Sequence, residues 1–265
     1  MASKISFTAN VAENYEKYMV PLFFEPYSKD IISRLPGKIE TVLEIACGTG
    51  QVTRLLAKQL PEAAIIATDL NPGMIEVAKK TLTNEKIEWK IADAQELPFE
   101  DNTFDAAVCQ FGLMFLPDKQ KAVNEAYRVL KPGEKYIFNT WDSMENNPIK
   151  KIAHEVTNTF FPGNPVNFWH TPLSMYNPDE MKNLMQNAGF TYINVERISV
   201  EGHTNSAHDA ATGLTLGTPI YPALCERDEK LIPEIHKAVR DEIAKKYGEK
   251  DLTVSLKAWV AEGVK

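Results

Sequence analysis

The stretch TVLEIACGTGQVTRLLAK, residues 41 to 58, joins a β-branched apolar run to two glycines and then to a leucine-rich amphipathic segment. Residues 39–46 predict a buried strand, and residues 53–60 predict a helix that ends before Pro61, because proline cannot continue a helix. A glycine-rich turn between a strand and a helix lets backbone N–H groups approach a ligand. The stretch therefore predicts a strand, a cofactor-binding turn and a helix.

Strand and helix patterns continue to alternate up to residue 142. Strands are expected at residues 63–70, 86–93, 103–111 and 134–141. One helix should begin at Asn71-Pro72, with Asn71 as its N-cap, and another should cover residues 118–130. Because the strands are continuously apolar, they are expected to be buried on both faces. The pattern predicts an α/β fold: a Rossmann-like, mostly parallel sheet with helices on both faces.

The remaining residues add two strands and several helices to this sheet. A helix ending at Gly189, a strand over 190–200, mostly helical residues over 205–248 and a last strand over 252–264 complete a seven-stranded sheet. We expect one domain over residues 1–265, with residues 1–35 as a helical cap and 36–142 as the cofactor-binding core. Residues 143–178 and 203–250 are expected to be substrate-side insertions, because each is too small to bury much core of its own.

Composition limits the classes of function. The 265 residues are 44% hydrophobic and carry a formal net charge of −7 without a basic patch, which argues against a nucleic-acid partner. The N-terminus lacks a signal-peptide core, and no apolar run reaches the length of a membrane span. Three widely spaced cysteines suit reduced thiols, and the five histidines lack metal-ligand spacing. We expect a cytoplasmic protein without a metal; its oligomeric state stays open.

The residues around the turn discriminate between cofactors. Asp69 follows Gly48 by 21 residues, at the end of the second strand, where an acid can hold ribose hydroxyls. A nicotinamide enzyme would want a third glycine at the position of Thr53, and its pyrophosphate would be repelled by Glu44. A sulfonium cofactor would be attracted by Glu44 instead. A nicotinamide-dependent oxidoreductase and a plain tight turn with a surface acid remain the less favoured alternatives.

Several short motifs, in a fixed order over about 100 residues, carry a resemblance. They are Glu44-x-x-Cys47-Gly48-Thr49-Gly50, Asp69-Leu70-Asn71-Pro72-Gly73-Met74, residues 92–99 (ADAQELPF), Phe104-Asp105 and residues 125–133 (EAYRVLKPG). This series resembles the class I S-adenosylmethionine-dependent methyltransferases, and within them the ubiquinone/menaquinone-biosynthesis-like enzymes that act on small molecules. Glu134 departs from the family, which usually has a second glycine there.

The resemblance implies S-adenosylmethionine as the cofactor and a binding set at the carboxyl ends of the strands, with one residue from the cap. The set is Tyr18, Glu44, Ala46, Gly48, Gly50, Asp69, Leu70, Met74, Asp93, Ala94, Gln110 and Phe111. In such enzymes the backbone of the glycines would pass under the methionine part, which Glu44 and Ala46 would line.

The other members of the set would hold the nucleoside and the sulfonium. The Asp69 carboxylate would accept both ribose hydroxyls, while Leu70 and Met74 would pack on the adenine ring. Asp93 and the backbone of Ala94 would meet the adenine amino group and a ring nitrogen. Gln110 and Phe111 would flank the sulfonium.

The methyl acceptor is less well determined by the sequence. Methyl transfer from a sulfonium is an in-line displacement that needs positioning and a dry site rather than a protein nucleophile, so no catalytic residue is assigned. His170 is the best candidate for a general base. Aromatic residues of the cap and between Phe160 and Tyr176, together with residues 214–219, predict a pocket for an apolar or aromatic small molecule. A protein that binds the cofactor without catalysis is the second alternative.

Overall fold

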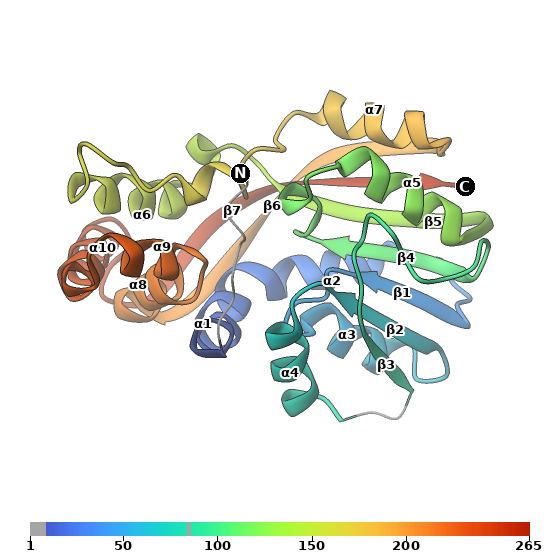
Figure 1. Cartoon of the computed structure of the whole chain (residues 1–265), viewed down its shortest axis with the longest axis horizontal. Helices are drawn as coiled ribbons and strands as arrows, with labels where there is room; N and C mark the ends of the chain where they lie inside the picture. The colour runs from blue at the N-terminus through green and yellow to red at the C-terminus, as the bar shows by residue number, and fades with distance from the viewer. Residues whose placement is uncertain (1–8, 84–85) are drawn as a thin grey trace. The chain divides into compact units, whose positions relative to one another are not determined.

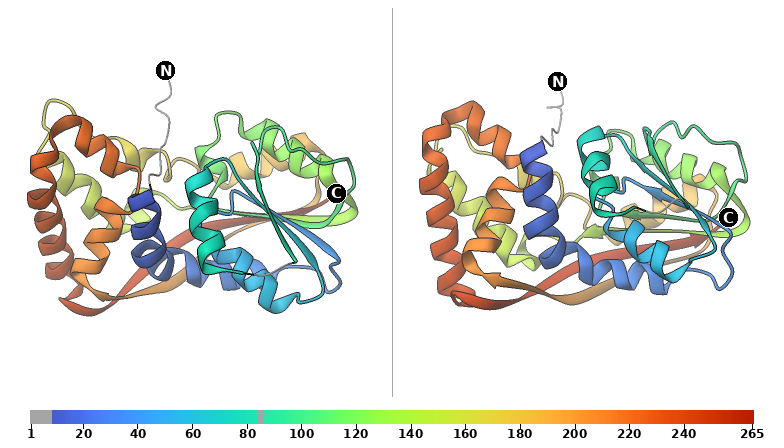
Figure 2. Two further views of the ribbon diagram at one scale, coloured as in Figure 1. Left: turned by 60° about the horizontal axis from the view of Figure 1, so that its bottom comes forward. Right: turned by 90° about the horizontal axis from the view of Figure 1, so that it is seen from below.

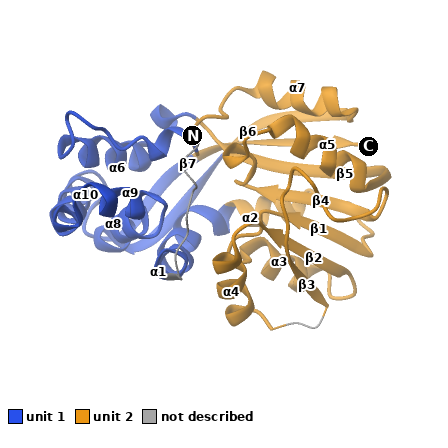
Figure 3. Ribbon diagram, in the orientation of Figure 1, with its two compact units in different colours: residues 1–26, 143–171, 199–256 blue, residues 27–142, 172–198, 257–265 orange. Residues whose placement is uncertain are grey.

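The computed structural model describes residues 9–83 and 86–265; the first eight residues of the expected cap lie outside this part. The chain separates into two compact units (Figure 3). Unit 1 comprises residues 1–26, 143–171 and 199–256, and unit 2 comprises residues 27–142, 172–198 and 257–265. The expectation of a single domain stays a prediction. Within the described ranges, no helix is both long and apolar enough to cross a membrane.

A seven-stranded, mostly parallel sheet confirms the predicted fold class. The strands are β1 (Thr41–Ile45), β2 (Ala64–Asp69), β3 (Ile87–Ile91), β4 (Phe104–Gln110), β5 (Leu130–Trp141), β6 (Thr191–Ser206) and β7 (Lys250–Val264). Their order is β3-β2-β1-β4-β5-β7-β6; β1 to β5 pair in parallel, and β7 runs antiparallel to β5. The order reverses between β1 and β4, which is where open α/β sheets place ligands, outside the carboxyl ends of the strands.

Helices cover both faces of the sheet in unit 2 (Figures 1 and 2). On one face, α2 (Glu25–Ser33), α3 (Gln51–Gln59) and α4 (Pro72–Thr81) bury apolar side chains against the strands in one cluster. On the opposite face lie α5 (Lys119–Val129) and α7 (Pro178–Ala188), which pack against each other. Burial on both sides explains why β4 is continuously apolar from Ala106 to Cys109.

Two helix ends follow the predicted capping residues Asn71 and Gly189, and a third has a cap at Asp118 that was not predicted. The Asn71 side chain accepts a 2.9 Å hydrogen bond from the Gly73 amide at the start of α4, and Asp118 accepts one of 2.9 Å from the Lys121 amide at α5. At the end of α7, Gly189 takes the left-handed conformation (φ 101°). A Cβ there would lie 3.1 Å from the Tyr127 ring, so both conformation and space favour glycine.

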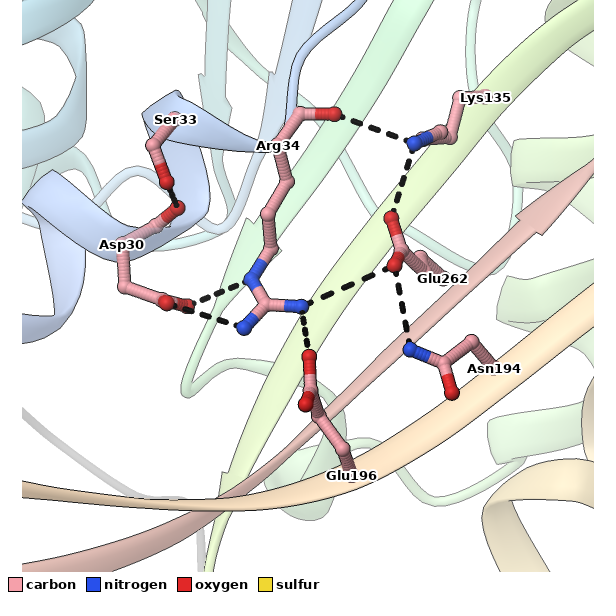
Figure 4. A network of polar contacts seen from close by, with 7 residues as sticks. All are labelled: Asp30, Ser33, Arg34, Lys135, Asn194, Glu196 and Glu262. Atoms are coloured by element: carbon pink, nitrogen blue, oxygen red, sulfur yellow. Dashed lines mark hydrogen bonds and ion pairs between the residues drawn. The ribbon is translucent and has the colours of Figure 1, made fainter.

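A charged network ties α2 to β5, β6 and β7 (Figure 4). The Arg34 guanidinium makes two hydrogen bonds to Asp30, of 2.8 and 3.0 Å, and a third of 2.5 Å to Glu196. Lys135 donates to the Arg34 carbonyl (3.2 Å) and to Glu262 (2.9 Å). These bonds attach the C-terminal turn of α2 to strands that are distant in sequence.

Unit 1 is mostly helical. It contains α1 (Ala9–Asn14), a π-helix η1 (Tyr15–Phe24), α6 (Pro148–Thr159), α8 (Ala207–Leu216), α9 (Ile220–Asp228) and α10 (Ile232–Tyr247). The helical stretch predicted over 205–248 is confirmed as α8 to α10. The π-helix, which has Pro21 inside it, was not predicted, nor was α6 as a helix of 12 residues within the irregular segment. The π-helix packs on α8, where Gly213 leaves room for Tyr18 and Met19.

Candidate functional site

The turn between β1 and α3 contains two glycines, Gly48 and Gly50, and each position favours glycine for a different structural reason. Ala46, Gly48 and Gly50 all have positive φ, at 55°, 56° and 82°. A Cβ on Gly48 would meet no atom within 4 Å, whereas one on Gly50 would lie 2.9 Å from the Trp89 ring. Gly48 therefore faces open space that a ligand can occupy, and Gly50 allows close packing beneath the turn.

Glu44 lies under this turn, near the end of β1. Glu44 is 2% exposed, and its carboxylate accepts a 2.5 Å hydrogen bond from the Thr53 hydroxyl. Burial raises the pKa of Glu44 to about 8, against the lowering effect of the Thr53 hydrogen bond. Its predicted part in lining the methionine stays a prediction. The role of Thr53 was missed, because in the sequence Thr53 counted only as the absent third glycine.

Asp69 at the end of β2 is held by backbone amides from two turns. One of its oxygens accepts from Gly48 N and the other from Asn71 N, both at 2.8 Å. Burial raises the pKa of Asp69, while these amide hydrogen bonds act in the opposite direction. Because a carboxylate offers about four acceptor positions, Asp69 can still accept from two ribose hydroxyls.

Two large apolar side chains are exposed at the same edge of the sheet. Leu70, directly after β2, is 62% exposed, and Ile91, the last residue of β3, is 59% exposed. Ile91 pairs with Asp69 in the sheet register. Ile91 was not predicted, although its apolar side chain at a strand end was a signal. Met74, which was expected on the adenine, is buried in α4.

The loop after β3 is fixed by hydrogen bonds from its own residues and from α5. The Asp93 carboxylate accepts from the backbone (2.8 Å) and the side chain (3.1 Å) of Gln95, and the side-chain Oε1 of Gln95 accepts from Asp118 N (2.9 Å). The Glu125 carboxylate accepts from Leu97 N, and Arg128 donates to the carbonyls of residues 97 and 99. The motif at 125–133 thus holds the motif at 92–99 in place.

The end of β4 is packed into an aromatic group. Phe111 has a positive φ of 53° and stacks on Trp141, with centroids 3.8 Å apart and an angle of 6°. Tyr27 meets both rings edge-on, at 5.2 and 5.3 Å. Phe111 N donates to Asn139 Oδ1 at 3.0 Å. Phe111 is therefore a buried part of the site's frame, whereas Gln110, one residue earlier, is half-buried.

The structure brings all the predicted cofactor residues except Tyr18 into unit 2, and all of these except Met74, which lies in α4, are at the carboxyl ends of β1 to β4. Tyr18 lies in the π-helix of unit 1, and its role stays a prediction. His170 also belongs to unit 1, where its ring meets His154 edge-on at 4.9 Å. Among residues 9–83 and 86–265, no cluster of three or more histidine, cysteine or acidic side chains could hold a metal ion.

Asp105, which belongs to one of the family-like motifs, lies at the opposite end of the strands, near the amino end of β4. Its carboxylate accepts from the amides of Glu40 (2.9 Å) and Thr41 (2.8 Å) and pairs with Lys131 at 2.5 Å. Burial alone would raise the pKa of Asp105, but the hydrogen bonds to the carboxylate outweigh this effect and lower the pKa to about 2. Asp105 therefore joins the amino ends of β1 and β4 and supports the fold.

Comparisons with known proteins show the family of the chain. Residues 43–138 match the model of the methyltransferase domain family. The chain is 32% identical over 177 residues to the ubiquinone/menaquinone biosynthesis C-methyltransferase UbiE of Haemophilus ducreyi, covering 61% of this chain and 68% of that protein. It is 32% identical over 174 residues to the demethylmenaquinone methyltransferase of Lactobacillus johnsonii, covering 60% of this chain and 70% of the relative.

The solved structures show the same fold. A phosphoethanolamine N-methyltransferase 2 of Haemonchus contortus, in complex with phosphomonomethylethanolamine and S-adenosylhomocysteine, superimposes with a TM-score of 0.64 at 18% identity, covering 97% of this chain and 57% of that one. From the sequence relatives and the fold together, the chain belongs to the class I S-adenosylmethionine-dependent methyltransferases, in the group of the UbiE-like enzymes.

Proposed function

We propose that the residues at the carboxyl ends of β1 to β4 hold S-adenosylmethionine. The open side of Gly48 would receive the methionine part, and Asp69 would accept the ribose hydroxyls. Leu70, together with Ile91, would cover the adenine, and the Asp93 carboxylate would accept a hydrogen bond from the adenine amino group. The observation that carries the placement is the Asp69 carboxylate, which is fixed by Gly48 N and Asn71 N, the first of these from the turn that carries the open glycine.

The residues present fit the chemistry of this cofactor. A Cβ at Gly48 would meet nothing within 4 Å, so the turn offers a cradle. The two exposed apolar side chains suit a flat ring, and Glu44 supplies a negative charge beneath the turn when it is ionised. S-adenosylmethionine supplies the activated methyl group, so the protein has to position the acceptor and exclude water.

The proposed acceptor is a small apolar or aromatic molecule that is methylated on carbon. The aromatic content of residues 160–176 supports an apolar acceptor, and the names of the relatives support a quinol-like ring and carbon as the methylated atom. We also propose that the protein works in the cytoplasm, which suits its three free cysteines.

A transfer assay with S-adenosylmethionine labelled in its methyl group tests this function. The acceptors are a naphthoquinol without a ring methyl group and phosphoethanolamine, and Asp69→Ala serves as the control. The proposal expects label on a ring carbon of the naphthoquinol, and far less with the control variant. Label on phosphoethanolamine alone would overturn the aromatic acceptor. Binding of S-adenosylhomocysteine without transfer to any acceptor would indicate a protein that has lost catalysis.

A further inference from the structure

Asn139 occupies an unusual place for an amide side chain, in the middle of the sheet. It lies on β5, is 0% exposed, and stands opposite Gln110 of β4 in the register. Its Oδ1 accepts from Phe111 N at 3.0 Å, while its Nδ2 is buried and has no hydrogen-bond partner in the part of the chain that the structure describes. Because an unpaired buried amide hydrogen is costly, the hydrogen bond made by the oxygen must offset that cost.

The oxygen of Asn139 holds a strained residue. Phe111 has a φ of 53°, a region that bulky residues rarely adopt, and such a conformation persists only where the surroundings over-determine it. Here Phe111 N is shared by two acceptors, the Asn139 carbonyl (3.2 Å) and the Asn139 side chain (3.0 Å). The stack on Trp141 fixes the ring at the same time.

The left-handed turn at Phe111 brings the next residue against the cofactor turn. Gly112 lies so close to Ala46 that an added Cβ would be 2.5 Å from the Ala46 Cβ and 2.9 Å from the Cys109 sulfur. Ala46 is itself left-handed, at φ 55°, and leads directly into Cys47 and Gly48. A continuous chain of contacts thus runs from Asn139 on β5, through Phe111 and Gly112, to the turn after β1.

We propose that Asn139 is a positioning residue, which fixes the methionine side of the cofactor site through the contact between Gly112 and Ala46. The proposal rests on the cofactor placement proposed above. It separates the two halves of the site, because Asp69 accepts from Asn71 N and Asp93 accepts from Gln95 N, and neither bond involves Asn139; only the second bond of Asp69, from Gly48 N, links it to the turn. Loss of Asn139 should therefore affect the methionine part of a ligand and spare the nucleoside part.

The test compares two ligands on the full-length protein. S-adenosylhomocysteine fills both halves of the site, and adenosine fills only the nucleoside half. Asn139→Ala should bind S-adenosylhomocysteine about tenfold more weakly, since the turn after β1 is no longer held in its binding conformation, and should bind adenosine within about twofold of the parent. Asn139→Asp keeps an oxygen for Phe111 N and should restore most of the affinity.

Thr140→Val is the matched control. Thr140 is the next residue on β5, is equally buried, and bonds to the Met175 carbonyl at 2.8 Å, away from the proposed site. It should lose stability without a change in the ratio of the two affinities. An Asn139→Ala variant that binds S-adenosylhomocysteine like the parent, or that loses both ligands equally, would overturn the proposal.

A second variant keeps the test decisive if Asn139→Ala fails to fold. Ala46→Gly relieves the positive φ and removes the methyl group that meets Gly112. It should fold and lose S-adenosylhomocysteine affinity selectively, and in the double variant the two losses should not add, because they break the same chain of contacts. Parental affinity in Ala46→Gly would overturn the proposal. If the unaltered protein fails to bind S-adenosylhomocysteine, the proposed cofactor placement is wrong. If the unaltered protein binds it and the variants show no selective loss of affinity, only the proposed role of Asn139 is wrong.

Discussion

The Thr53 hydroxyl donates a hydrogen bond to the buried carboxylate of Glu44, across 2.5 Å and from α3 to β1. This contact occupies the position where dinucleotide-binding turns carry their third glycine. An acidic side chain is thus built into the core beneath the turn, and whether it carries a charge depends on pH.

Glu44 should make the protein less stable as pH rises. Its pKa is about 8 in the folded chain against 4.5 ordinarily, so between these values the folded state binds one proton more than the unfolded state. The free energy of unfolding should fall by about 1.4 kcal/mol per pH unit in this window, be largest below pH 4.5 and level off above pH 8. Glu44→Gln should be more stable than the parent at pH 8, with a smaller difference at pH 5.

Urea unfolding between pH 5 and pH 9 measures this effect. Part of the fall should persist in Glu44→Gln, because burial also raises the pKa of Asp69. Glu88→Gln, on the exposed side of β3, is the control and should keep the parental slope. Identical slopes for the parent and both variants would show that Glu44 is ionised in the folded protein across this range.

The two glycines of the turn should respond differently to alanine. Both substitutions cost about 1–2 kcal/mol of strain, because both residues are left-handed. Gly50→Ala should cost about 1–3 kcal/mol more, since its methyl group would press on Trp89. Gly48→Ala should remain folded but bind S-adenosylhomocysteine weakly, because the methyl group enters the ligand's space. Melting temperatures and titration calorimetry check both variants. Parental affinity in Gly48→Ala would show that the turn is not part of the cofactor site.

Asp69 and Asp105 form a matched pair, since each carboxylate accepts from two backbone amides. Asp69→Ala should weaken binding of S-adenosylhomocysteine by about 1.5–3 kcal/mol, because charge-assisted hydrogen bonds to the ribose are lost. Asp105→Ala should lower stability and leave the affinity nearly unchanged, since it lies at the other edge of the sheet. Calorimetric titration of both variants decides the matter; equal losses of affinity would mean that the Asp69 effect is indirect.

The exposed side chains Leu70 and Ile91 should contribute to binding without supporting the fold. Replacing either by serine should lower the affinity for both adenosine and S-adenosylhomocysteine by about 1 kcal/mol, because apolar surface against the adenine is lost. Melting temperatures should stay at the parental value. Tyr192→Ser, at an 89% exposed position on β6, is the control. Variants of Leu70 and Ile91 that match this control in affinity would place the adenine elsewhere.

Much of unit 2 could be predicted from the sequence, because its strands and helix ends are marked by short sequence patterns that the packed structure keeps. Continuous apolar runs gave the strands, Asn71 and Gly189 gave the helix ends, and the spacing of Gly48 and Asp69 placed both at the same edge. The π-helix was not predicted; it contains Pro21 and packs against α8, which is far away in the sequence.

The parts of the site that were missed depend on neighbours far away in the sequence. Thr53 and Glu44 are nine residues apart, and Phe111 and Asn139 are 28 residues apart, so no local pattern marks either contact. Likewise, a methionine at position 74 suits an adenine pocket and a helix core equally well, and only the packing of α4 shows that it is buried.

The most direct test of the cofactor placement is a titration of the isotope-labelled protein with S-adenosylhomocysteine, observed at the backbone amides. The amides of Gly48, Asn71 and Ala94 should shift first and saturate together, and NAD should leave them unchanged. Shifts confined to other residues, or equal shifts with NAD, would contradict the placement of S-adenosylmethionine at the carboxyl ends of β1 to β3.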